Sequence, residues 1–150
     1  MSKEFNECLQ RYKLPAFDTA WGEIHRGIEK ESLRVSPDGH ISSSPHPQAL
    51  GSSLTNPFIT TDFSESLLEF ITPAYSDIDE CLKTMEDIHR FTLQNIENDE
   101  MLWVSSMPCP LDTSEAIPIA QFGSSNVGKL KTLYRHGLSN RYGRLMPVSY

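Results

Sequence analysis

Carboxylates placed inside apolar segments are the main candidates for chemistry in this sequence. The stretch from Ile59 to Pro73 is rich in residues that favour a packed β-strand, yet it contains Asp62, Glu65 and Glu69. An ionised acid in such surroundings is costly unless a cation or several hydrogen bonds receive it. The pattern therefore predicts a partner for these acids.

A second acidic segment, predicted to be a strand, lies upstream from Gly27 to Val35. Glu29 and Glu31 alternate with other residues, so on a strand both point to the same face. If two acidic strands share one face, their oxygen ligands suit Mg²⁺ or Mn²⁺, which nucleotide phosphates often help to coordinate. The same spacing is typical of a solvent-exposed edge strand, and spacing alone does not choose between the two interpretations.

Length and composition indicate a soluble globular protein with one core. The chain has 150 residues, of which 38% are hydrophobic and 22% charged. A formal net charge of −7 argues against a general binder of nucleic acids or anionic membranes, because both need a basic surface. A polyanion could bind only at a local basic patch or through a metal ion.

The lack of a recognisable targeting signal and the pattern of cysteines lead us to expect a cytoplasmic location. The first residues are polar, and no apolar run is long enough to act as a signal peptide or to span a bilayer. Cys8, Cys81 and Cys109 are widely spaced and form no C-x-x-C pair. We expect free thiols in a reducing compartment and assign them no role.

The elements that must position the acids begin with an N-terminal arm. Residues 1–22 are expected to form a short helical packing arm, broken at Pro15. A turn at residues 36–39 predicts a hairpin, and breaker residues predict a loop over residues 42–57. His40 and His46 have no partner at helical spacing, so we expect exposed loop histidines rather than metal ligands.

Two helices are predicted in the second half. The first should run from residue 76 to about residue 98 and pack one apolar stripe on the sheet. Its stripe consists of Ile78, Leu82, Met85, Ile88, Thr92 and Ile96. An irregular traverse over residues 101–118, partly buried through Trp103 and Leu111, leads to a second helix over residues 129–146 that contains a basic cluster.

A near match to the phosphate-loop pattern spans Gly123 to Leu130. The pattern G-x-x-x-x-G-K-[ST] fails at its last place, because Leu130 has no hydroxyl to hold Mg²⁺. Pro118 also weakens the strand that should precede such a loop. The sequence favours a Gly-Ser-Asn turn before a helix, and a small phosphate-loop nucleotidase stays as a minor alternative.

Several ordered segments together closely resemble bacterial (type I) glutamate–cysteine ligase. The resemblance extends over residues 23–146, and its strength lies in the number of segments that match in order. The segments are Arg26-Gly-Ile-Glu-Lys-Glu-Ser-Leu-Arg-Val, His46-Pro-Gln-Ala-Leu-Gly-Ser, Ile59-Thr-Thr-Asp-Phe-Ser-Glu-Ser-Leu-Leu-Glu-Phe-Ile-Thr-Pro, Ser106-Met-Pro-Cys, Gln121-Phe-Gly-Ser-Ser-Asn-Val-Gly, Lys131-Thr-Leu-Tyr-Arg and Asn140-Arg-Tyr-Gly.

The resemblance implies a fold class and an activity. The fold is expected to be α+β, with part of the antiparallel sheet of a glutamine-synthetase-like ligase and packed helices. The family joins the γ-carboxylate of L-glutamate to the amine of L-cysteine with ATP and Mg²⁺, through a γ-glutamyl phosphate, as the first step of glutathione biosynthesis. Divalent cations would neutralise the transferring phosphoryl group.

The resemblance also assigns residues. Glu29, Glu31, Asp62 and Glu69 match Mg²⁺-binding carboxylates, whereas Glu65 is left as a surface residue. The resemblance also implies a pocket for the substrate cysteine and a catalytic guanidinium, which would stabilise phosphate or carboxylate charge. The pocket residues are Phe63, Tyr134 and Leu138, and the guanidinium is that of Arg135.

Residues 147–150 depart from the family pattern. The family continues with a further part that holds a metal-binding histidine, another carboxylate, most ATP contacts and the remaining strands. We therefore expect residues 1–150 to be a single incomplete domain, the N-terminal part of the catalytic domain, inactive and poorly stable by itself. The alternative is a non-catalytic remnant that binds metal weakly, or a fragment that complements the missing C-terminal portion.

Overall fold

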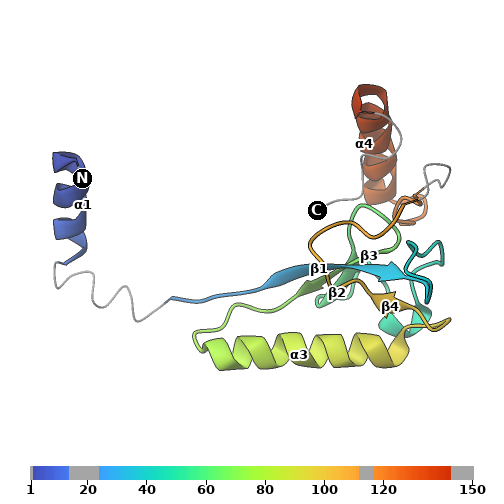
Figure 1. Ribbon diagram of the computed structural model, residues 1–150, viewed down its shortest axis with the longest axis horizontal. Coiled ribbons are helices and arrows are strands. Elements are labelled where there is room, and N and C mark those ends of the chain that lie inside the picture. The colour runs from blue at the N-terminus through green and yellow to red at the C-terminus, as the bar shows by residue number, and fades with distance from the viewer. Residues whose placement is uncertain (1, 14–23, 112–116, 143–150) are drawn as a thin grey trace.

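A computed structural model describes residues 2–13, 24–111 and 117–142 of the chain, with side chains as far as Tyr134 (Figure 1). The predicted roles of Arg135 and Leu138 therefore lie outside the described side chains. The divergent residues 147–150 lie outside the described part altogether.

Four antiparallel strands form one sheet, in the order β2-β3-β1-β4. With its helices, this sheet confirms the predicted α+β class. The register places Glu31 of β1 directly opposite Glu69 of β3, so both acidic segments do share a sheet face. The strands are β1 (Glu29–Val35), β2 (Ile59–Thr61), β3 (Leu67–Ile71) and β4 (Met101–Leu102).

The segment from residue 59 to residue 73 is not one strand, and that prediction was wrong. It folds back on itself as β2 and β3, joined by a connection over residues 62–66. Asp62 N–H donates to the Leu67 carbonyl at 2.9 Å, and the Ser64 hydroxyl lies 2.6 Å from that of Ser66. Aspartate and serine favour turns because their side chains offer the backbone local hydrogen bonds.

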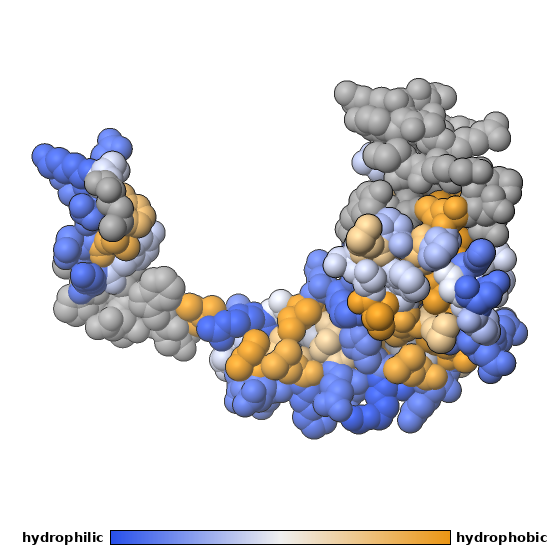
Figure 2. All heavy atoms as spheres, in the orientation of Figure 1, coloured by the Kyte–Doolittle hydropathy of each residue, from blue (hydrophilic) through white to orange (hydrophobic). Residues whose placement is uncertain are grey.

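Helix α3 (Ile78–Asn95) covers one face of the sheet (Figure 1). It begins at Asp77, whose side chain accepts the Asp79 N–H at 2.7 Å, close to the predicted start. Met85 and Ile88 pack against Leu68 and Phe70 of β3, as the predicted stripe requires. Figure 2 shows mostly hydrophilic residues along the lower rim where α3 lies, interrupted by small apolar patches.

The predicted stripe of α3 is rotated at its N-terminal end. Ile78 and Leu82 are 44% and 52% exposed, whereas Cys81 is fully buried. The Thr72 hydroxyl lies 3.3 Å from the Cys81 sulfur, which draws this side of the first turn against the end of β3. A free cysteine behaves as a small apolar residue, and the predicted stripe did not include Cys81.

The opposite face of the sheet is divided into an apolar end and an acidic end. Leu33, Val35 and Leu67 pack there with Cys109 and Ile117, and Trp103 and Leu111 lie partly buried against them. This confirms the predicted partial burial of Trp103 and Leu111, although the stretch predicted to be irregular begins with strand β4 and its residues 112–116 lie outside the described part. Toward the start of β1, glutamates replace the leucine and valine side chains on the same face.

Helix α1 (Lys3–Tyr12) buries none of its residues, although we expected a packing arm. The turn at residues 36–39 is confirmed, with Gly39 at φ 85° and Val35 bridged to Ile41. The loop over residues 42–57 contains only the 3-10 turn η1 (Gln48–Leu50). Within the described ranges, no helix has the length and apolar character needed to cross a membrane.

Candidate functional site

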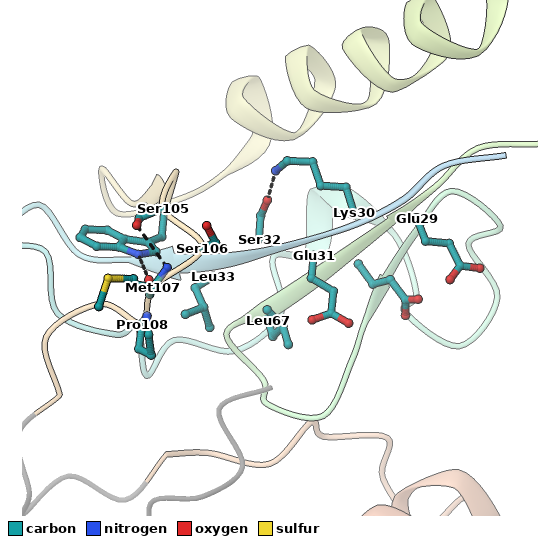
Figure 3. Close-up of a pocket in the computed structure, with 12 residues that line it drawn as sticks. Glu29, Lys30, Glu31, Ser32, Leu33, Leu67, Ser105, Ser106, Met107 and Pro108 are labelled. Atoms are coloured by element: carbon teal, nitrogen blue, oxygen red, sulfur yellow. Dashed lines mark hydrogen bonds between the residues drawn. The ribbon is translucent and has the colours of Figure 1, made fainter. Parts of the chain in front are cut away.

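The acidic end of the sheet collects carboxylates from three elements. Glu29 and Glu31 project from the same side of β1, while Lys30 and Ser32 point to the other side (Figure 3). Glu69 lies between β1 and β2 on β3, paired with Glu31 on one side and Thr60 on the other. Asp62 immediately follows β2. The fold thus brings together the four acids that the sequence predicts as metal ligands.

Electrostatics identify Glu69 as the centre of this group. Partial burial raises the pKa of Glu69 above its ordinary value, and the negative charges of Asp62 and Glu29 raise it further, while Lys131 lowers it. Carboxylates that repel one another at a half-buried place hold protons more tightly. The same repulsion would be relieved by a bound cation.

A cavity of about 480 Å³ opens over these acids (Figure 3). Its acidic wall comes from Glu29, Glu31 and Glu69, and its other wall from Trp103 and residues 105–108. Trp103 is fixed at both ends: its backbone N–H donates to the Leu33 carbonyl at 2.8 Å, and its indole N–H to the Met107 carbonyl at 2.6 Å. The Trp103 wall was not predicted as part of a site, although the Ser106 segment belongs to the family resemblance.

Helix α4 (Asn126–Tyr142) brings a lysine to the edge of the acidic face. Lys131 Nζ lies 3.9 Å from Asp62 Oδ1, donates to the carbonyls of Thr61 and Asp62, and sits 4.8 Å from the Phe122 ring centre. Burial lowers the pKa of Lys131, and Asp62 and Glu69 oppose that shift. In the sequence, Lys131 lies in a basic cluster and in a segment of the family resemblance, but nothing in the helical spacing points to Asp62.

Two of the predicted cysteine-pocket residues meet. The rings of Phe63 and Tyr134 are 5.6 Å apart in an edge-to-face arrangement, the geometry that aromatic pairs prefer. Phe63 comes from the connection over residues 62–66 and Tyr134 from α4. Tyr134 is nevertheless 62% exposed, so this pair forms an open apolar surface beside the acids.

Glu65 is not a surface residue, and that expectation was wrong. Only 4% of it is exposed, and its two carboxylate oxygens accept the N–H groups of His46 and Gln121. His46 itself is half-buried, with its ring nitrogens 2.9 Å from the Thr61 hydroxyl and 3.1 Å from the Gly51 carbonyl. These long-range contacts leave no trace in local sequence spacing.

The donor set suits a hard divalent cation. The four acids supply only oxygen ligands, as Mg²⁺ and Mn²⁺ prefer, and a cation bound there would oppose the effects of burial, Asp62 and Glu29 that raise the pKa of Glu69. Among the described residues, no three His, Cys, Asp or Glu side chains already stand as a compact metal-binding group. The side chains fit the ion in kind, and their convergence on it would accompany binding.

The turn before α4 is not a phosphate loop. Residues 117–122 make an antiparallel bridge between Ser64 and Ile119 rather than a parallel strand. The Ser125 hydroxyl accepts the Gly128 N–H at 3.1 Å, so it caps one of the backbone donors that a phosphate would use. A Cβ at Gly128 would lie 2.7 Å from the Gly123 carbonyl, so close packing requires this glycine.

The sequence model of the glutamate–cysteine ligase family matches residues 9–149 of the chain. The chain belongs to the glutamate–cysteine ligase family. The match confirms the resemblance inferred from the sequence and extends it beyond residues 23–146 at both ends.

Curated relatives support the membership. Over 123 residues the chain is 58% identical to the glutamate–cysteine ligase of Proteus mirabilis, covering 82% of this chain and 23% of the relative. Over 145 residues it is 50% identical to the glutamate–cysteine ligase of Aliivibrio fischeri, covering 97% of this chain and 27% of the relative. The chain therefore spans about a quarter of the length of these relatives.

Solved structures share the fold. A glutamate–cysteine ligase from Francisella tularensis, crystallised in complex with AMP, aligns with a TM-score of 0.74 and 46% identity over 83% of this chain and 25% of that one. A bifunctional glutathione synthetase from Pasteurella multocida aligns with a TM-score of 0.71 and 32% identity over 83% and 16% of the two chains. This member of the glutamate–cysteine ligase family thus shares its fold with part of each of these two structures.

Proposed function

We propose that this chain supplies the metal-binding and cysteine-binding part of an ATP-dependent glutamate–cysteine ligase site. The observation that supports this most is the gathering of four acids at one end of one sheet face, namely Glu29, Glu31, Asp62 and Glu69. Burial and the charges of Asp62 and Glu29 raise the pKa of Glu69 there. Structural sheets do not need four acids in such a place, whereas phosphoryl transfer needs cations there.

Mg²⁺ or Mn²⁺ would be held by these four carboxylates. When bound, the cation would neutralise charge on the phosphates of ATP and on the carboxylate that accepts the phosphoryl group. The chain's own contribution is to fix the ligands on strands: β1 and β3 are hydrogen-bonded neighbours, so Glu31 and Glu69 keep their separation. Rigid strands position ligands better than loops do.

The reaction joins two substrates and consumes a third. The γ-carboxylate of L-glutamate takes the terminal phosphoryl group of ATP, the amine nitrogen of L-cysteine then attacks the activated carbonyl, and phosphate leaves as the amide bond forms. In this proposal Phe63 and Tyr134, with Leu138, receive the cysteine side chain, and Arg135 stabilises phosphate or carboxylate charge. Edge-to-face rings beside the acids would hold the amine near the activated carbonyl.

Nucleotide binding separates this proposal from the phosphate-loop alternative. The test measures binding of a fluorescent ATP analogue to the 150-residue chain with and without Mg²⁺, for the wild type, Glu29→Gln and Lys129→Ala. We expect Glu29→Gln to reduce the Mg²⁺-dependent gain in affinity roughly tenfold, and Lys129→Ala to leave it unchanged. The reverse pattern would support a phosphate loop and overturn the proposal.

Turnover is a separate question. We expect the 150-residue chain alone to release no ADP in the joint presence of glutamate, cysteine, Mg²⁺ and ATP, because it spans about a quarter of its relatives. A folded, metal-binding but inactive chain would match the alternative of a complementing fragment. We place the protein in the cytoplasm, a location that its three free cysteines suit.

A further inference from the structure

Glu65 has no place in the predicted metal site, yet it is one of the most buried acids in the described chain. Its Oε1 accepts the His46 N–H at 2.9 Å, and its Oε2 accepts the Gln121 N–H at 2.6 Å. Hydrogen bonds to a charged oxygen are roughly twice as strong as neutral ones, and two of them offset much of the desolvation of a buried carboxylate. Both oxygens are directed to backbone donors, so Glu65 is unsuited to bind a metal ion.

The backbone around Glu65 binds the same neighbouring segment. Glu65 N–H donates to the Pro118 carbonyl at 2.9 Å, and Ala120 N–H donates to the Phe63 carbonyl at 3.0 Å. Residues 117–122 therefore run antiparallel to residues 63–65, and the Glu65 side chain adds a third link at Gln121. These three hydrogen bonds fix residues 117–122 against the β2–β3 connection.

That segment leads directly into α4. After Phe122 the chain turns at Gly123, which has φ 60°, and α4 begins at Asn126. Farther along, α4 contacts the same connection again, because Lys131 meets Asp62 and Tyr134 meets Phe63. The connection is thus bound both by residues 117–122 and by α4.

We propose that Glu65 is a positioning residue that sets the distance between α4 and the β2–β3 connection, and thereby the Phe63–Tyr134 pair and the Asp62–Lys131 pair. The inference rests on the proposed function, because those pairs are the proposed cysteine surface and the edge of the metal site. A glutamine cannot replace Glu65. Its oxygen could accept only one of the two backbone N–H groups, and its NH₂ group would face the other N–H, so that those two donors would have no acceptor.

Proton NMR of the full chain tests the inference through two ring pairs. The wild type should show nuclear Overhauser contacts between the rings of Phe63 and Tyr134, and between those of Phe70 on β3 and His89 on α3, whose centres are 4.8 Å apart. Glu65→Gln should lose the Phe63–Tyr134 contact and keep the Phe70–His89 contact. Glu86→Gln, which removes an exposed acid on α3, is the matched control and should keep both.

A general loss of folding would remove both contacts in Glu65→Gln, and Gln121→Pro then decides. This variant keeps Glu65 and its bond to His46 but removes the Gln121 N–H, through which the Glu65 side chain binds residues 117–122. Loss of the Phe63–Tyr134 contact alone supports the inference. Retention of that contact in either variant, its absence from the wild type, or loss of both contacts in Gln121→Pro overturns it.

Metal binding separates failure of this inference from failure of the proposed function. Mn²⁺ affinity of Glu65→Gln should fall roughly tenfold, as expected for a residue that orients ligands without touching the ion. If the wild type binds no Mn²⁺, the proposed function fails, while the ring contacts still test the positioning role. If Mn²⁺ affinity is unchanged but the ring contact is lost, Glu65 positions the cysteine surface alone.

Discussion

Two groups of charged residues in this molecule contrast in how their charge is balanced. Arg34 is fully buried, and its guanidinium donates to Glu100 at 2.7 Å, to the Ser44 carbonyl at 2.7 Å and to the Glu65 carbonyl at 3.0 Å. The acidic end of the sheet is more exposed, and the pKa of Glu69 is raised there by partial burial first and by the charges of Asp62 and Glu29 next. The buried group is thus built around an ion pair, whereas the exposed group places acids beside one another.

The difference separates a structural charge from the one that we propose to be functional. Arg34 and Glu100 tie β1 to the residue before β4 and to the loop over residues 42–57, and each supplies the other's counter-charge, although among the described residues the Arg34 Nε–H finds no hydrogen-bond partner. On the acidic face, partial burial and then the charges of Asp62 and Glu29 raise the pKa of Glu69, while Lys131 opposes the shift. Ionisable groups with shifted pKa values gather at functional sites, which is why we propose a metal ion there.

The largest effect is expected from Glu100→Gln. The substitution leaves the Arg34 guanidinium buried without its counter-charge, and breaking a buried ion pair in this way costs about 3 kcal/mol or more. Urea denaturation of the variant and wild type measures the free energy of unfolding. A loss below about 1 kcal/mol would mean that the pair is no stronger than an exposed one.

An opposite and smaller effect is expected from Glu69→Gln in the absence of metal. The variant removes a carboxylate that its neighbours Asp62 and Glu29 repel, so the free energy of unfolding at pH 7 should rise. Thermal denaturation with a chelator present measures the change. A decrease in stability would show that Glu69 is already balanced by a partner within the chain.

The pH dependence of that gain has a definite sign. The folded-state pKa of Glu69 is raised, so the native chain holds this proton more tightly than the unfolded chain does. Ionised Glu69 therefore lowers stability as pH rises through its folded-state pKa, and the advantage of Glu69→Gln should vanish below the unfolded pKa of about 4.5. A gain that is constant from pH 7 to pH 4 would contradict the assigned cause.

The smallest effect is expected from Asp87→Asn. Lys83 and Asp87 on α3 are as close as Arg34 and Glu100, at 2.7 Å, but their side chains are 73% and 48% exposed. Solvent screens such a pair, so we expect little measurable change in the urea midpoint. A loss as large as that of Glu100→Gln would remove the distinction between buried and exposed charges.

Local patterns predicted much of the fold. Acids alternating on β1, the turn at Gly39 and the start of α3 near Asp77 are all encoded within a few residues. The break between β2 and β3 was missed, because the apolar residues on both sides conceal a connection whose turn chemistry depends on Ser64 and Ser66. Periodicity records the face a residue occupies more readily than a reversal of the chain.

The candidate site was put forward from its acids, whereas the residues that support those acids were not predicted. Spacing and family resemblance selected Glu29, Glu31, Asp62 and Glu69, and the register brings their strands together. The contacts of Glu65 with His46 and Gln121, and that of Lys131 with Asp62, join residues 19 to 69 positions apart. Only tertiary structure brings such residues together, so no local pattern could reveal them.

Direct Mn²⁺ binding tests the central claim, that the acidic end of the sheet binds a divalent cation. Water-proton relaxation during an Mn²⁺ titration of the 150-residue chain would compare the wild type with Glu69→Gln and with Glu86→Gln, which removes an exposed acid of α3. We predict saturable binding that Mg²⁺ competes for, weakened roughly tenfold or more in Glu69→Gln and unchanged in Glu86→Gln. Equal binding by all three proteins, or no saturable binding by the wild type, would contradict the claim.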